Sequence, residues 1–156
     1  MIYFLLTAAI IFIDQIAKIA IRTMLTEGQS IKVISDFFSL TYVRNDGAAF
    51  SSFRGQQLLL VAVSTAVVAV ALIFLWKNRK KDKLLCSGLA MVAGGGAGNL
   101  IDRAVFGSVT DMFSFSIFPP VFNVADIGVV IGCSLIIVYS IVSERREKDK
   151  KRAKSK

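Results

Sequence analysis

The chain has 156 residues, of which 54% are hydrophobic even without counting glycine, and its mean hydropathy is +0.63. Because soluble domains contain only about 45–50% apolar residues with glycine included, this composition excludes an ordinary soluble core. The sequence contains no histidine, which excludes Ser–His and Cys–His hydrolases and the common zinc sites that use this residue.

Four stretches are long and apolar enough to cross a bilayer, which takes about 20 residues of helix. They are residues 2–22, 57–76, 84–101 and 123–142. The second and third contain no charged residue, and the fourth contains only Asp126, near its start. The predicted fold class is therefore an α-helical integral membrane protein with four transmembrane helices, in which residues 1–156 form a single membrane-embedded domain.

The net charge of +8 is concentrated at two places. The loop 77–83 holds five of the 19 basic residues, and the tail 144–156 holds eight. Both clusters adjoin ends of predicted spans, which is the pattern of cytoplasmic loops. The loop and both chain termini are therefore predicted to be cytoplasmic, with the segments 23–56 and 102–122 on the outer side. We interpret the tail as a topology signal that touches membrane lipid, with a nucleic-acid patch as the less favoured alternative.

Residues 2–22 have no basic segment in front of them and no small-residue cleavage site behind them, which favours a retained helix over a secretory signal peptide. Asp14 and Lys18 are four residues apart and therefore share a face of this helix. Two interpretations of the pair stay open. Either it is an ion pair within the helix, or Asp14 turns into the bundle to support a functional site. The second interpretation arises because ionisable groups inside a membrane span are costly and usually functional.

The segment 30–54 differs from the spans, because apolar and polar residues partly alternate there and β-branched and aromatic side chains are frequent. This pattern predicts a small antiparallel sheet on the outer surface, between the first and second helices. The Asn-Asp-Gly signal at 45–47 has two interpretations. Either it is the turn of a hairpin, or it places Asn45 over the same region as Asp102 and Asp111.

Small residues recur at four-residue spacing in the third span, at Ala90, Gly94 and Gly98, and in the fourth, at Gly128 and Gly132. Such spacing lets two helix backbones approach closely in lipid. We therefore predict tight packing of the third helix, which brings the polar residues at its end close to the start of the fourth.

Polar residues gather where the third and fourth spans meet the outer water boundary. Asn99, Asp102 and Arg103 are spaced to form one face at the end of the third helix, and Asp111 follows in a short loop. Asp126 falls in the first turn of the fourth helix. Taken singly, each has an ordinary explanation: Asp102 and Arg103 would cap the helix end and pair with each other, and the helix dipole favours a carboxylate in a first turn.

Taken together, two aspartates at a membrane boundary cannot both ionise cheaply, so they share a proton. One then acts as general base toward water and the other as general acid toward the leaving amine, as in aspartic proteases. A small transporter is the main alternative, because intramembrane carboxylates also mark ion pathways, although those usually lie near the midplane. A non-catalytic membrane scaffold is the third.

Five short motifs follow one another along the chain: DQIAK at 14–18, RNDGAAF at 44–50, GGGAGNLIDR at 94–103, VTDMF at 109–113 and FNVAD at 122–126. With these motifs on four spans, the sequence resembles the lipoprotein signal peptidase (signal peptidase II) family over essentially its whole length. The resemblance implies an aspartyl endopeptidase of the bacterial cytoplasmic membrane that cleaves signal peptides from diacylglyceryl-modified prolipoproteins, N-terminal to the lipid-modified cysteine. It also implies inhibition by globomycin-type peptides and no need for a metal or cofactor. We expect a monomer that binds no nucleic acid.

The same resemblance implies roles for individual residues. Asp111 and Asp126 match the catalytic dyad, near the extracytoplasmic face. Asp14 and Asp102 match supporting carboxylates, and the segment 30–54 matches the family's small β-cradle. The polar residues that are implied to line the substrate groove are Asn45, Asn99, Arg103 and Asn123.

Overall fold

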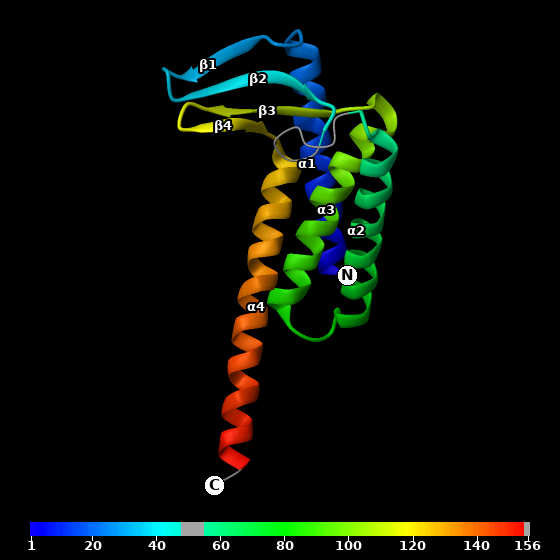
Figure 1. Cartoon of the computed structure of the whole chain (residues 1–156), viewed down its shortest axis with the longest axis vertical. Helices are drawn as coiled ribbons and strands as arrows, with labels where there is room; N and C mark the ends of the chain where they lie inside the picture. The colour runs from blue at the N-terminus through cyan, green and yellow to red at the C-terminus, as the bar shows by residue number, and fades with distance from the viewer. Residues whose placement is uncertain (48–54, 155–156) are drawn as a thin grey trace.

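The computed structural model describes residues 1–47 and 55–154, and four long helices form most of it (Figure 1). The helices are α1 (Ile2–Met24), α2 (Gln57–Asn78), α3 (Lys83–Phe106) and α4 (Val124–Lys154). All four are long and apolar enough to cross a membrane. The predicted α-helical membrane fold with four spanning helices is therefore confirmed.

An antiparallel sheet of four strands lies across one end of the helix bundle, which we call the sheet end (Figure 1). The strands are β1 (Ser30–Ile34), β2 (Phe38–Asn45), β3 (Val109–Phe115) and β4 (Phe118–Phe122), in the order β1-β2-β3-β4. The chain's N-terminus and the connection from α2 to α3 lie away from the sheet end, and α4 extends furthest in that direction (Figure 1). The predicted basic tail is thus largely a helical continuation of α4.

Only half of this sheet comes from the segment in which a sheet was predicted. Strands β1 and β2 lie between α1 and α2, as expected, and residues 48–54 of that segment fall outside the described residues. Strands β3 and β4 lie between α3 and α4, so the prediction that Asp111 lies in a short loop is wrong. The central β2–β3 pairing sets Val43 opposite Asp111 and Asn45 opposite Val109, and so joins two parts of the chain that are far apart in sequence.

Helix α3 continues five residues beyond the predicted end of the third span, to Phe106. Gly107 caps the C-terminal end of this helix. It adopts the left-handed conformation (φ 75°), in which a residue with a side chain would be strained. The prediction that Asp102 and Arg103 cap this helix is therefore wrong. Both lie inside its last turns, and their side chains serve contacts with other elements.

Helix α3 occupies the middle of the bundle. Over its apolar window 56% of the residues are buried, against 17–28% for the other three helices. Glycines make this possible: a Cβ added at Gly88 would lie 2.8 Å from the backbone oxygen of Gly132, and one added at Gly95 would collide with the backbone oxygen of Ala125. The predicted close packing of the third and fourth helices is confirmed, and it holds the first turn of α4 against α3.

Candidate active site

The structure brings Asp111 and Asp126 to one cavity of about 650 Å³ at the sheet end of the bundle. The cavity, which we call the dyad cavity, has walls from α2, α3, α4 and the sheet. Its apolar walls include valines of α2 and α4, such as Val63, Val67 and Val130. Among the described residues, its polar lining includes Asn45, Asn99, Arg103, Asp111, Asp126 and the hydroxyl-bearing Ser64. An apolar groove with a few converging polar groups is a common form of ligand site.

Asp111 lies on β3 with only 2% of its surface exposed. Its Oδ2 accepts a hydrogen bond from Asn45 Nδ2 (3.0 Å), and its Oδ1 accepts one from Asn123 Nδ2 (2.6 Å). Burial, and secondarily the nearby Asp126 carboxylate, raise the pKa of Asp111 from 3.8 to about 6, although the two amide donors oppose this shift. This carboxyl group therefore holds its proton more readily than an ordinary aspartate.

Asp126 lies in the first turn of α4, where a reciprocal pair of hydrogen bonds fixes it. The Asp126 backbone N–H donates to Asn123 Oδ1 (2.9 Å), and the Asn123 backbone N–H donates back to Asp126 Oδ2 (3.2 Å). This is the capping-box arrangement, with asparagine and aspartate in the two roles. The other carboxylate oxygen, Oδ1, accepts from Asn99 Nδ2 (2.8 Å). Asp126 is only half-buried and faces the dyad cavity.

Asn123 links the two carboxylates. It is fully buried, and its amide nitrogen donates both to Asp111 Oδ1 and to Asn99 Oδ1, the latter at 3.2 Å. Because its own carbonyl oxygen accepts from Asp126, one side chain sets the positions of both acids. Of the four residues predicted to line a substrate groove, Asn45, Asn99 and Arg103 line the dyad cavity, whereas Asn123 lies behind its wall.

Arg103 lines the dyad cavity. Its Nη2 donates to the backbone oxygen of Gly47 (3.0 Å), and its own backbone oxygen accepts from Gln57 Nε2 (2.8 Å). Its Nε is buried and has no hydrogen-bond acceptor among residues 1–47 and 55–154. The guanidinium group therefore ties the end of α3 to the chain after β2 and keeps a donor near the two acids.

The open interpretation of the 45–47 signal is resolved by these contacts. The hairpin between β1 and β2 turns at residues 35–37, and Asn45 instead ends β2 opposite β3. Its Oδ1 accepts from the Gly47 backbone N–H (3.0 Å) while its Nδ2 donates to Asp111. Asn45 is therefore not part of a hairpin turn but reaches the site, as the second interpretation predicted.

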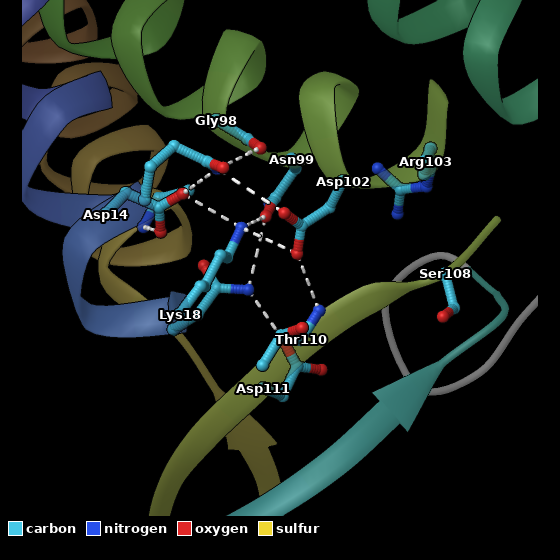
Figure 2. Close-up of polar contacts among 12 residues, drawn as sticks. Asp14, Lys18, Gly98, Asn99, Asp102, Arg103, Ser108, Thr110 and Asp111 are labelled. Carbon is cyan, nitrogen blue, oxygen red and sulfur yellow. Dashed lines mark hydrogen bonds and ion pairs between the residues drawn. The ribbon is translucent and has the colours of Figure 1, made fainter. Parts of the chain in front are cut away.

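Behind the two acids lies a buried ionic cluster, which Figure 2 shows. Lys18 Nζ is 2.9 Å from Asp14 Oδ2 and 3.5 Å from Asp102 Oδ2, and all three side chains have no exposed surface. Arg22 Nη1 lies 3.4 Å from Asp102 Oδ1. Asp14 thus forms the ion pair within α1 and also turns into the bundle, where it bonds to the Ala125 backbone; its role in supporting a functional site stays a prediction. Sequence reasoning did not assign Lys18 or Arg22 a part in the site, although the i, i+4 spacing of Asp14 and Lys18 pointed to the first of them.

We expect the shifted pKa of Asp111 to appear in the stability of the protein. A carboxyl group whose folded-state pKa is raised stabilises the fold fully below its unfolded value, near 3.8, and that contribution is lost as the pH rises through about 6. The loss amounts to about 3 kcal/mol at most. Thermal unfolding in detergent between pH 3 and pH 8 should show wild type losing stability relative to the Asp111→Asn variant. A difference that does not change with pH would contradict this prediction.

The comparisons with known proteins agree with the fold and with the family that the sequence resembles. The family model described as Signal peptidase (SPase) II matches residues 6–142. The chain is 36% identical to the lipoprotein signal peptidase of Pelotomaculum thermopropionicum over 154 residues, which cover 99% of this chain and 100% of that protein. It is 40% identical to the lipoprotein signal peptidase of Halothermothrix orenii, covering 87% of this chain and 92% of that one.

A solved structure of a bacterial membrane enzyme, determined by the in meso method at 2.3 Å resolution, also resembles this chain. It has a TM-score of 0.85 and 28% sequence identity, over 91% of this chain and 88% of that one. A second bacterial membrane enzyme, determined by the same method at 1.9 Å resolution, gives a TM-score of 0.80 at 29% identity, over 88% and 90% of the two chains. Sequence and structure therefore agree: this chain belongs to the signal peptidase II family and is a multi-pass membrane protease.

Proposed function

We propose that the protein is an aspartyl endopeptidase that removes signal peptides from diacylglyceryl-modified prolipoproteins by cutting N-terminal to the lipid-modified cysteine. One observation carries the proposal. Two carboxyl groups, Asp111 on β3 and Asp126 on α4, line one cavity in a membrane-spanning bundle, and the buried Asn123 bonds to both. Membership of the signal peptidase II family supports the same reaction.

In the proposed mechanism, the two aspartates have different roles. Asp126, ionised, takes a proton from a water molecule, whose oxygen attacks the scissile carbonyl carbon. Asp111, protonated, donates its proton to the carbonyl oxygen, and its raised pKa supports this role. When the tetrahedral intermediate collapses, Asp126 gives its proton to the leaving nitrogen. Asp111 regains its proton from the hydroxyl as the new carboxyl group forms, so the dyad returns to its starting state.

The walls of the dyad cavity fit a substrate that is half lipid and half peptide. Valines from α2 and α4 line the part between the helices, where acyl chains of the substrate would remain in contact with the bilayer. The polar end holds Asn45, Asn99 and Arg103. We assign these three residues, with Asn123, to holding the peptide backbone and the dyad, and Asp14 and Asp102 to supporting them.

The proposed setting is the bacterial cytoplasmic membrane, with one chain forming a single peptidase domain that works as a monomer. The sheet end would face the extracytoplasmic side. The basic residues between α2 and α3, together with those at the end of α4, lie away from the sheet end (Figure 1). Basic loops stay in the cytoplasm, which supports cytoplasmic termini and an outward-facing active site.

The test is a cleavage assay with purified protein in detergent. The substrate is a synthetic signal peptide whose cysteine carries a diacylglyceryl group, and the control is the same peptide with an unmodified cysteine. We expect a product that begins at the lipidated cysteine, no product from the control peptide, and inhibition by globomycin. Cleavage of both peptides at equal rates, or at another bond, would contradict the proposed specificity.

A further inference from the structure

Lys18 is a buried charge that the proposed chemistry does not use. Its side chain has no exposed surface, although a buried cation is costly unless it is closely paired. Three oxygens surround its Nζ: Asn99 Oδ1 at 2.8 Å, Asp14 Oδ2 at 2.9 Å and Asp102 Oδ2 at 3.5 Å (Figure 2). An intrahelical pair with Asp14 alone would not require the contact with Asn99, which lies on α3.

Asn99 Oδ1 accepts from Lys18 Nζ at 2.8 Å and from Asn123 Nδ2 at 3.2 Å, and these two donors determine which way the amide points. An ammonium group can only donate hydrogen bonds, so the atom of Asn99 that faces Lys18 has to be the carbonyl oxygen. The amide nitrogen is then turned to the opposite side, where it donates to Asp126 Oδ1 at 2.8 Å. If the amide were reversed, its oxygen would face the carboxylate of Asp126 and the two would repel each other.

Lys18 is also linked, through its two carboxylate partners, to the backbone next to the two dyad residues. Its partner Asp14 accepts, through Oδ1, the backbone N–H of Ala125 at 2.9 Å. Its other partner, Asp102, accepts through Oδ2 the backbone N–H of Thr110, also at 2.9 Å. Ala125 and Thr110 each directly precede one of the two dyad residues. The cation thus sits between two carboxylates that are each bonded next to a proposed catalytic acid.

We propose that Lys18 is a positioning residue that acts through Asn99: together with Asn123, it fixes the orientation of the Asn99 amide and thereby holds the carboxylate of Asp126 in place. The inference rests on the proposed function, because it assumes that Asp126 takes part in catalysis. It assigns Lys18 no contact with the substrate. Because the Asn99 amide nitrogen that Lys18 orients is bonded to Asp126 Oδ1, the effect falls mainly on the catalytic step and less on substrate binding.

The test is a double-mutant cycle measured with the lipidated peptide. Lys18→Met keeps the length and much of the volume of the side chain but cannot donate. We expect it to lower kcat about 10- to 100-fold, by analogy with residues that orient metal ligands through a hydrogen bond, with little change in KM. In an Asn99→Ala background the same substitution should have a much smaller effect on kcat. Equal effects in the two backgrounds would overturn the proposal.

A second variant covers the case in which Lys18→Met does not fold. The cluster of Asp14, Asp102, Lys18 and Arg22 is neutral overall. Adding Asp102→Asn to Lys18→Met therefore restores neutrality, and the amide oxygen of the new asparagine can still accept from Thr110. The cycle is then run with Asp102→Asn alone as its reference, and the same smaller effect in the Asn99→Ala background is expected.

Leu75→Ala is the control for instability. Leu75 lies on α2, is fully buried in the hydrophobic core of the helix bundle and is absent from the lining of the dyad cavity. This variant should therefore lower the melting temperature while kcat of the folded fraction stays near wild type. If Lys18→Met behaves in the same way, Lys18 is merely structural and the inference fails. If the separate Asp126→Asn variant remains active, the proposed function fails instead, so the two failures are distinguishable.

Discussion

Replacing either Asp111 or Asp126 by asparagine is expected to abolish peptide cleavage, with kcat falling by about 10⁴-fold. Asparagine has nearly the same shape as aspartate but cannot take a proton from water or donate one as an acid. Asp126→Asn should retain the helix cap, since an amide oxygen can still accept the Asn123 backbone N–H that now bonds to Oδ2. Asp111→Asn loses one of two hydrogen bonds, because one amide donor would face another.

The measurement is the cleavage rate of the lipidated peptide, together with a melting curve that shows each variant to be folded. Asp36→Asn is the matched control, because Asp36 is an exposed aspartate between β1 and β2 that pairs with Lys32 at the surface. This control should cleave at the wild-type rate. Turnover retained in Asp111→Asn or Asp126→Asn would remove that residue from the dyad and leave the aspartyl mechanism without support.

Hydropathy located the four helices because each must stay apolar over about 20 residues. Hydropathy predicts the end of the third span five residues before the end of α3, for a physical reason. Asp102 and Arg103 were expected to mark the end of the span, since charges in lipid are costly. In the folded protein the Asp102 carboxylate is compensated by Lys18 and Arg22 from α1, so the helix continues to Phe106. Compensation by a residue distant in sequence leaves no trace in a local hydropathy pattern.

The local pattern does not indicate the strand that carries Asp111, for a related reason. Residues 109–112 are all buried, so this part of β3 lacks the alternation of polar and apolar residues that reveals a half-exposed strand. Its pairing with β2 depends on contacts with a segment more than 60 residues away. The residue types needed for the site were visible in the sequence, whereas the hydrogen bonds from Asn45 and Asn123 to Asp111 depend on this pairing and on the start of α4.

Replacing Gly95 by alanine is expected to displace α4 and lower kcat by about 100-fold or more. A Cβ at this position would collide with the backbone oxygen of Ala125 and lie 3.0 Å from the backbone nitrogen of Val129. Backbone atoms cannot move aside as a flexible side chain can, so the first turn of α4 has to shift away from α3. Asp126 follows Ala125 directly, and a displacement of about 1 Å at a catalytic group costs about 10²-fold in rate.

Gly128→Ala on the next turn of α4 separates this effect from a general intolerance of larger residues between the two helices. A Cβ at Gly128 would lie 3.3 Å from Ile10 Cγ2 and 3.5 Å from the backbone oxygen of Met91, which calls for only a small adjustment. We therefore expect Gly128→Ala to keep kcat within a few-fold of wild type, whereas Gly95→Ala also loses about 1–3 kcal/mol of stability through overpacking. Because the rate depends on where Asp126 lies, the loss of kcat in Gly95→Ala should persist at low temperature, where the variant is folded. Recovery of the wild-type rate there would show that the close α3–α4 contact serves stability alone.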